Sequence, residues 1–190
     1  MLRRLALTGG AAAGVVLAGW WSAVAPATRV PTTQTIEPKG LAMRFELSAD
    51  WGINSLISGD NGWEWEAFSP GQTANVRIAT QRTSLPFAKI APLYVHDVQV
   101  ATKKPVSADP HGLFRATRVT IGGEPAAKIT VRGEGIDQVG GVSELTTVDY
   151  VLVHGGLLYI IEFDTPQQFA RRFLPTIARV AATARFLHVA

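Results

Sequence analysis

The sequence contains no cysteine among its 190 residues. This excludes a disulfide framework, a catalytic thiolate, an iron–sulfur cluster and a cysteine zinc site, and it leaves no residue to carry a diacylglycerol anchor. Charged residues are also few, at 17% of the chain, whereas 47% of the residues are hydrophobic, so the chain is not intrinsically disordered. The length suits one folded domain.

The N-terminal segment has the pattern of an export signal. Arg3 and Arg4 precede residues 5–25, an uncharged run of 21 residues that is long enough to cross a bilayer as a helix. A paired arginine before a run rich in glycine and alanine resembles a twin-arginine signal. We therefore expect residues 1–27 to be an export signal or a membrane anchor, with the rest of the chain outside the cytoplasm. Cleavage and retention both stay open, and a retained segment would hold residues 5–25 in the membrane.

The overall charge gives no indication of a nucleic-acid partner. The sequence pI is about 9.5, but removal of the paired arginines leaves 16 basic residues against 15 acidic residues. Residues 26–40 contain three prolines and four threonines without apolar periodicity, which predicts an extended linker over residues 28–40. The folded domain is then expected over residues 41–190.

Alternation of apolar and polar residues dominates the chain beyond residue 41 and predicts antiparallel strands. One group of strands is expected at residues 43–48, 53–57, 63–67 and 74–79, and a second group at residues 113–121, 127–131, 148–152 and 157–163. Residues 60–62, the Asp-Asn-Gly tripeptide, and the glycine pairs at 122–123 and 155–156 predict tight hairpin turns. Each group is expected to form one meander.

Two amphipathic helices are predicted, one after each group of strands. Apolar residues recur at helical spacing over residues 87–101, where Pro92 predicts a kink or a late start. After Pro166, one side of the second helix carries Phe169, Phe173, Ile177, Val180 and Ala184, and the other carries Arg171, Arg172 and Arg179. Pro175 is expected to bend this helix near Phe173. The fold class is therefore α+β, an antiparallel sheet of two meanders covered by two main helices.

Three segments carry a resemblance to a known family. They are FELSADW at residues 45–51, GGEPAAKITV at 122–131 and DYVLVHGGLLYIIEF at 149–163. With the order of the elements and the closing helix, they make residues 41–188 similar to the PsbP superfamily, which includes extrinsic photosystem proteins and envelope lipoproteins of the LpqN type. The resemblance implies an α/β/α sandwich and a non-enzymatic docking, stabilising or ligand-handling role, although the chain lacks the cysteine of the lipoprotein branch.

Enzymatic function has little support in the sequence. A metal site would need Asp109 and His111 to meet His96, and none of the histidines has the spacing of a zinc helix motif. Glu64 and Glu66 could act as an acid–base pair, but their alternation is also that of two solvated side chains on one strand. We expect no catalytic residue, no metal and no cofactor.

Aromatic and loop residues are the candidates for an interaction surface. Trp51 lies at a predicted turn, where we expect it to be exposed, whereas Trp63 and Trp65 share the face of Ala67 and are expected to pack under a helix. The loop over residues 103–112 contributes Lys103, Lys104, Asp109 and His111 to the predicted surface, although a plain solvated connector has the same composition.

The sequence favours a non-enzymatic, extracytoplasmic docking module, an accessory or assembly factor for a membrane-associated protein complex. The alternative is a carrier of a lipid or another apolar ligand. The two hypotheses differ in what fills the space between the sheet and the helices. A docking module has large side chains packed solidly there, whereas a carrier has an apolar cavity. A metal-dependent or acid–base enzyme is the second alternative.

Overall fold

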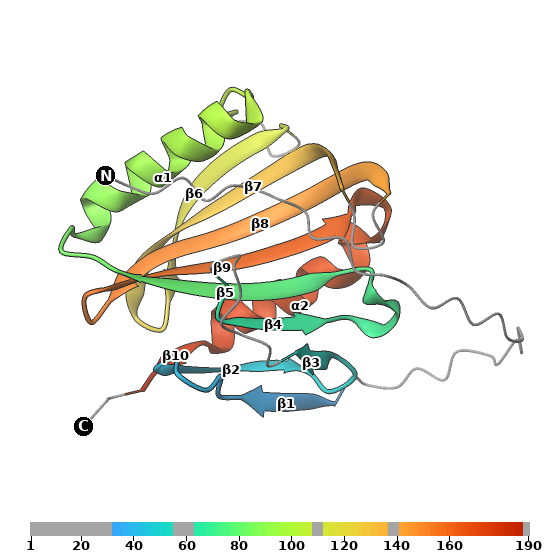
Figure 1. Cartoon of the computed structure of the whole chain (residues 1–190), viewed down its shortest axis with the longest axis horizontal. Coiled ribbons are helices and arrows are strands. Elements are labelled where there is room, and N and C mark those ends of the chain that lie inside the picture. Colours follow the sequence, from blue (N-terminus) through green and yellow to red (C-terminus); the bar gives the residue numbers. More distant parts are fainter. Residues whose placement is uncertain (1–31, 55–62, 108–111, 137–140, 188–190) are drawn as a thin grey trace, which may run out of the picture.

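The computed structural model describes residues 32–54, 63–107, 112–136 and 141–187, which form two sheets and two helices (Figure 1). The strands are β1 (Thr33–Ile36), β2 (Met43–Ser48), β3 (Gly52–Asn54), β4 (Trp65–Phe68), β5 (Asn75–Arg82), β6 (Phe114–Ile121), β7 (Glu124–Ile136), β8 (Val142–His154), β9 (Leu157–Pro166) and β10 (Arg185–Phe186). The helices are α1 (Phe87–Thr102) and α2 (Ala170–Thr183). No helix in these described ranges is long and apolar enough to span a membrane.

The larger sheet has seven antiparallel strands in the order β3-β4-β5-β9-β8-β7-β6. It consists of the meander β3-β4-β5 and the meander β6-β7-β8-β9, joined where β5 pairs with β9. Gly122 and Gly123 have positive φ angles in the β6–β7 turn, and Gly155 and Gly156 have positive φ angles in the β8–β9 turn. These conformations suit the tight hairpins predicted from the glycine pairs. The predicted turn at residues 60–62 lies outside the described residues.

The smaller sheet corrects two predictions made for the N-terminal part of the domain. Strand β2 does not continue into the first meander, because it pairs with β1 on one side and with β10 on the other. The linker predicted over residues 28–40 is also wrong in part, because Thr33–Ile36 forms β1 and Ile36 is buried. Local alternation cannot reveal the pairing of β2 with β10, because β10 lies near the other end of the chain.

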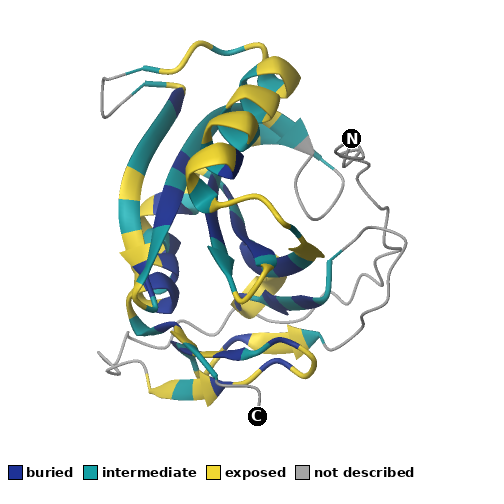
Figure 2. Cartoon of the chain, turned by 90° about the vertical axis from the view of Figure 1, so that its left-hand side faces the viewer, coloured by how far each residue is buried: buried dark blue, intermediate teal, exposed yellow. Residues whose placement is uncertain are grey.

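Both faces of the larger sheet are covered, which gives the predicted α/β/α arrangement. On one face, α1 packs over β7 and β8. On the other face, α2 lies against β9 and β6 and contacts β2 of the smaller sheet. Buried residues lie between the sheet and each helix, and the exposed residues of α1 lie on its outward side (Figure 2). A strand such as β8 or β9 is therefore buried on both faces, and charged residues at its alternate positions point into the protein.

The two helices confirm the predicted apolar stripes. In α2, Phe173, Ile177 and Val180 are buried, whereas the predicted outer arginines are exposed. Helix α1 begins at Phe87 and continues through Pro92, so the predicted late start is wrong. The bends predicted at the two prolines stay predictions.

Candidate functional site

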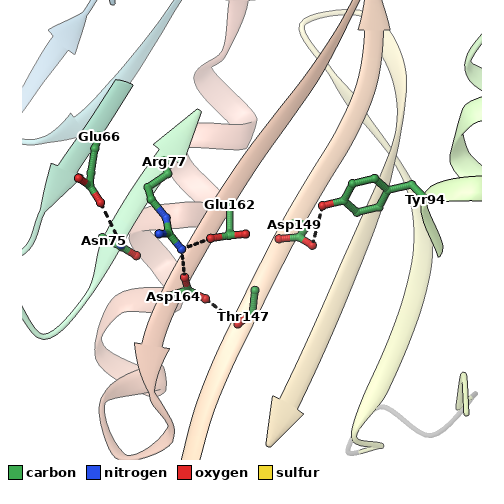
Figure 3. A network of polar contacts seen from close by, with 8 residues as sticks. All are labelled: Glu66, Asn75, Arg77, Tyr94, Thr147, Asp149, Glu162 and Asp164. Atoms are coloured by element: carbon green, nitrogen blue, oxygen red, sulfur yellow. Dashed lines mark hydrogen bonds and ion pairs between the residues drawn. The ribbon is translucent and has the colours of Figure 1, made fainter. Parts of the chain in front are cut away.

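A network of polar side chains crosses the α1 face of the larger sheet. It comprises Glu66 on β4, Asn75 and Arg77 on β5, Glu162 and Asp164 on β9, Thr147 and Asp149 on β8, and Tyr94 on α1 (Figure 3). The strand register brings these residues together, since Arg77 faces Glu162 and Glu162 faces Asp149 across neighbouring strands. We call this set the carboxylate network.

Arg77 lies at the centre of the network and binds two carboxylates. Its Nη2 forms ion pairs with Glu162 and with Asp164, the latter at 2.6 Å to Oδ2. The Thr147 hydroxyl donates to the other oxygen of Asp164 at 2.5 Å. The guanidinium also lies 4.8 Å from the centre of the Trp63 ring, a cation–π distance. These contacts fix Arg77 between strands β5 and β9.

Asp149 connects the network to helix α1. The Tyr94 hydroxyl donates a hydrogen bond of 3.2 Å to Asp149 Oδ2, while Asp149 Oδ1 is buried without a partner. Asp149 is only 4% exposed, and Glu162 is 6% exposed. A buried carboxylate with an unpaired oxygen is costly in its ionised form, because neither water nor a cation compensates the charge.

Burial and mutual repulsion change the proton affinity of these groups. Burial, followed by the charge of Asp164, raises the pKa of Asp149 to about 7. The same two causes raise the pKa of Glu162 well above its usual value, against the opposing effect of Arg77. Burial lowers the pKa of Arg77, but the surrounding carboxylates raise it by more in sum. One guanidinium is thus surrounded by more carboxyl groups than it can neutralise, and the network retains protons to unusually high pH.

The geometry of the network indicates a structural role better than a catalytic role. Two of its carboxylates are already bound by Arg77, and Asp149 lies beneath α1 in the middle of the sheet. A strongly perturbed pKa is a signature of active sites, but buried ion-pair networks produce it too. Among the residues that the structure describes, no group of three metal-ligating side chains is close enough to hold a metal ion. The network connects strands β4, β5, β9 and β8 with α1.

The expectation that Trp51 is exposed is wrong. Trp51 is 5% exposed and meets the Phe173 ring edge-on, with 5.9 Å between ring centres. It therefore belongs to the core on the α2 face of the larger sheet. A turn position indicates that the backbone reverses, but it does not determine where a large aromatic side chain packs.

Lys103 and Lys104, two other residues of the predicted interaction surface, do not join Trp51. Lys103 is exposed and ends α1 in a left-handed conformation, on the opposite face of the sheet from Trp51. Lys104 is half-buried, and its Nζ donates to the Arg132 backbone oxygen. Asp109 and His111 lie outside the described residues, so the predicted loop surface stays a prediction.

The predicted pairing of the tryptophans is also wrong. Trp65 is buried on the α2 face, where it meets Phe45 edge-on, but Trp63 packs against the core on the α1 face. Strand β4 begins at Trp65, so Trp63 lies before the strand and does not follow its alternation.

Glu64 and Glu66 likewise do not form a solvent-facing pair. Glu64 accepts a hydrogen bond from Thr80, whose cross-strand partner Tyr159 belongs to the core on the α2 face. Glu66 instead lies half-buried on the α1 face and accepts a hydrogen bond from Asn75 at 3.2 Å. The two carboxylates are on different faces of the sheet and cannot act together on one substrate.

The described histidines do not support the hypothetical metal site, which would need Asp109 and His111 to meet His96. His96 is exposed on the outer side of α1. His154 pairs with Glu124 at 2.8 Å and stacks on Phe186, with 4.1 Å between ring centres. Asp109 and His111, the other residues of that hypothetical site, lie outside the described residues.

Sequence reasoning missed the carboxylate network, although a signal for it exists. Asp149 and Glu162 each occupy the interior of a strand whose other residues are mostly apolar, and Arg77 lies between Val76 and Ile78. In a sheet that is covered on both faces, such charged residues must be buried and paired. The signal can be read only once both coverings are known.

Comparison with known proteins identifies the fold. No protein-family model matches the sequence, and no curated protein matches it significantly. Among solved structures, the chain is similar to PsbP (CyanoP) from Synechocystis sp. PCC 6803, with a TM-score of 0.53 and 10% identity, covering 86% of this chain and 97% of the other. It is also similar to the Ran-binding protein Mog1p from Saccharomyces cerevisiae, with a TM-score of 0.54 and 7% identity, covering 83% and 96%.

A third solved structure is larger than this chain. It is a protein from Bacteroides thetaiotaomicron, with a TM-score of 0.50 and 17% identity over 77% of this chain. The match spans only 46% of that protein. At these identities the comparisons show the fold alone. They confirm the PsbP-like fold that the sequence resemblance implied.

Proposed function

We propose that this PsbP-like domain is an exported, non-enzymatic docking module that binds a membrane-associated protein complex as an accessory or assembly factor. Three kinds of observation support the proposal. They are the packing of the core, the contacts that already engage the buried carboxyl groups, and the binding role of a protein with the same fold.

The observation that carries the proposal is the filling of the space between the sheet and the helices. On the α2 face, Phe173, Tyr159 and Trp65 are buried in one apolar cluster, and Phe169 packs against it. On the α1 face, Phe87 and Tyr94 pack against a second cluster. These are the large side chains that a docking module needs in its core, and that a carrier would have to displace to admit an apolar ligand.

The carboxylate network supports a non-enzymatic role. Two of its carboxyl groups are bound to Arg77, and its least satisfied group, Asp149, lies under α1. A substrate would have to displace the helix to reach this group. The network therefore supports the architecture of the domain rather than chemistry on a ligand.

The fold comparison adds a precedent for protein binding. The yeast protein with this fold is a Ran-binding protein, which means that the fold can present a surface to another protein. Such an analogy supports the class of function and names no partner for this chain. Export rests on the paired arginines and the uncharged run over residues 5–25.

Purification from the native host tests the proposal. The full chain carries a C-terminal tag, membranes are solubilised in mild detergent, and proteins enriched over an untagged strain are quantified by mass spectrometry. We expect the subunits of one membrane complex at near-stoichiometric amounts. Recovery of the chain without a partner protein would contradict docking, and a bound lipid in native mass spectra of the purified chain would support the carrier alternative.

A further inference from the structure

Three basic residues cluster beside the edge strand of the larger sheet, on the face opposite the carboxylate network. The carboxylate network lies on the α1 face, whereas Arg115 on β6 and Lys128 and Arg132 on β7 lie on the opposite face, which α2 partly covers. The register supports this placement. Lys128 pairs across strands with Tyr150, which belongs to the α2-side core, and Arg115 and Arg132 have the same alternation. We call these three residues the basic face.

The positive charges of the basic face form no ion pair with the described residues, although Glu134 and its cross-strand partner Glu144 lie further along the same face. Within the part of the chain that the structure describes, none of the three residues lies within ion-pair distance of a carboxylate. The Arg132 Nε is buried without a hydrogen-bond partner, and Lys128 Nζ lies 5.7 Å from the centre of the Tyr150 ring. Burial, followed by the charge of Arg115, lowers the pKa of Lys128. Half-buried like charges of this kind would be stabilised by an added anion.

The surroundings of the basic face suit an extended chain. Strand β6 is the last strand of the larger sheet. Apart from the bond from the Ser107 backbone nitrogen to the Phe114 oxygen at its first residue, no described strand pairs with its outer edge. Such an edge can accept another strand. Leu113, which is 56% exposed and hydrogen-bonded to the Arg132 backbone at 2.8 Å, adds an apolar contact beside the charges.

We propose that the basic face and the edge of β6 bind an extended acidic segment of the partner protein, an inference that rests on the proposed docking function. Carboxylates on alternate residues of such a segment would lie on one side of an added strand, beside Arg115, Lys128 and Arg132. A membrane surface fits less well. Basic residues that bind lipid headgroups project from the protein, whereas these three are half-buried on a sheet face.

Binding of a defined peptide to the full chain in detergent tests this proposal. The probe is a fluorescein-labelled peptide in which glutamate and threonine alternate, followed by fluorescence anisotropy, and a peptide of alternating glutamine and threonine is the uncharged control. The patch variant combines Arg115→Gln, Lys128→Gln and Arg132→Gln. The matched variant combines Lys89→Gln, Arg171→Gln and Arg179→Gln, which removes the same charge from exposed positions elsewhere.

We expect the patch variant to weaken binding of the acidic peptide by about tenfold or more, which is about 1.4 kcal/mol. The matched variant should stay within about twofold of the wild type, because exposed charges away from the site contribute little. The melting temperature of each variant is measured as well, so that a loss of binding is distinguished from a loss of folding. Equal losses in both variants, or no binding of the acidic peptide by the wild type, would overturn the proposal.

Flotation of the full chain with lipid vesicles distinguishes the membrane as occupant. Vesicles of phosphatidylcholine are compared with vesicles that also contain phosphatidylglycerol. If phosphatidylglycerol increases the fraction of the chain that floats, and this increase disappears only in the patch variant, the proposal is overturned in favour of a lipid surface.

In host purification, a partner that is retained equally by the wild type and the patch variant counts against this surface alone. Absence of any partner from the wild type counts against docking itself.

Discussion

Replacement of Asp149 by asparagine should change how the stability of the protein depends on pH. Asp149 is buried, accepts one hydrogen bond from Tyr94 and has one oxygen without a partner. Its pKa is raised from 3.8 to about 7 by burial, followed by the charge of Asp164. Asparagine has nearly the same shape and still accepts the Tyr94 hydrogen bond, but it cannot ionise. The substitution therefore removes the titration while retaining the contact.

The sign and size of the effect follow from proton linkage. The folded protein keeps the Asp149 proton to higher pH than the unfolded chain, so this group lowers the free energy of unfolding as the pH rises from about 4 to about 7. One pKa unit corresponds to about 1.4 kcal/mol, so the rise in the Asp149 pKa can lower the free energy of unfolding by at most about 4 kcal/mol. The Asn variant does not lose this stability, because its side chain does not ionise. Part of the difference will be shared with Glu162, because the Asp149 charge also raises the pKa of Glu162.

Urea titrations at several pH values between about 4.5 and 8 measure this effect. The wild type is compared with Asp149→Asn and with Asp97→Asn, a control at an exposed position of α1. We expect the stability of the Asp149 variant relative to the wild type to increase steadily with pH, while the Asp97 variant remains parallel to the wild type. Parallel curves for all three proteins would refute the assignment of a buried, protonated carboxyl to Asp149.

Four further substitutions test the packing and the ion pairs. Phe173→Ala should lower the free energy of unfolding by about 3 to 5 kcal/mol, because it removes a buried ring, whereas Arg171→Ala should change it by no more than about 0.5 kcal/mol; equal effects in urea would show that the helix stripe is misassigned. Arg77→Gln should cost about 3 to 5 kcal/mol near neutral pH and less in acid, because it leaves buried carboxylates without a cation; a loss that is independent of pH would contradict this account. Ile36→Ala should cost about 2 to 5 kcal/mol if β1 is part of the core, and an unchanged midpoint would restore the linker interpretation.

Much of the fold could be predicted from local patterns. Alternation predicts strands in the segments that form β2 and β4 to β9, the glycine pairs predict two hairpin turns, and the apolar stripes predict both helices. These features depend on neighbouring residues, so the sequence reveals them directly. The pairing of β2 with β10 could not be predicted in this way, because the two strands lie near opposite ends of the chain.

The candidate site was harder to predict than the fold. Alternation assigns Glu66, Arg77 and Glu162 to the polar side of their strands, which suggests that they face solvent. Glu162 is buried instead, and Glu66 and Arg77 are half-buried, because the strand register packs these side chains against one another. Trp51 was misplaced for a related reason, since its burial depends on Phe173, a residue far along the chain. Both errors come from long-range packing.

Site-specific photo-cross-linking in the native host tests the central claim most directly, namely that this domain docks to a protein through the α2-side face of its sheet. A benzophenone amino acid replaces Thr117, which pairs with Lys128 on the basic face, or His96, which is exposed on the outer side of α1 above the opposite face of the sheet. We predict a protein adduct of one defined mass from position 117 and none from position 96. A lipid adduct at position 117, or equal labelling from both positions, would contradict the claim.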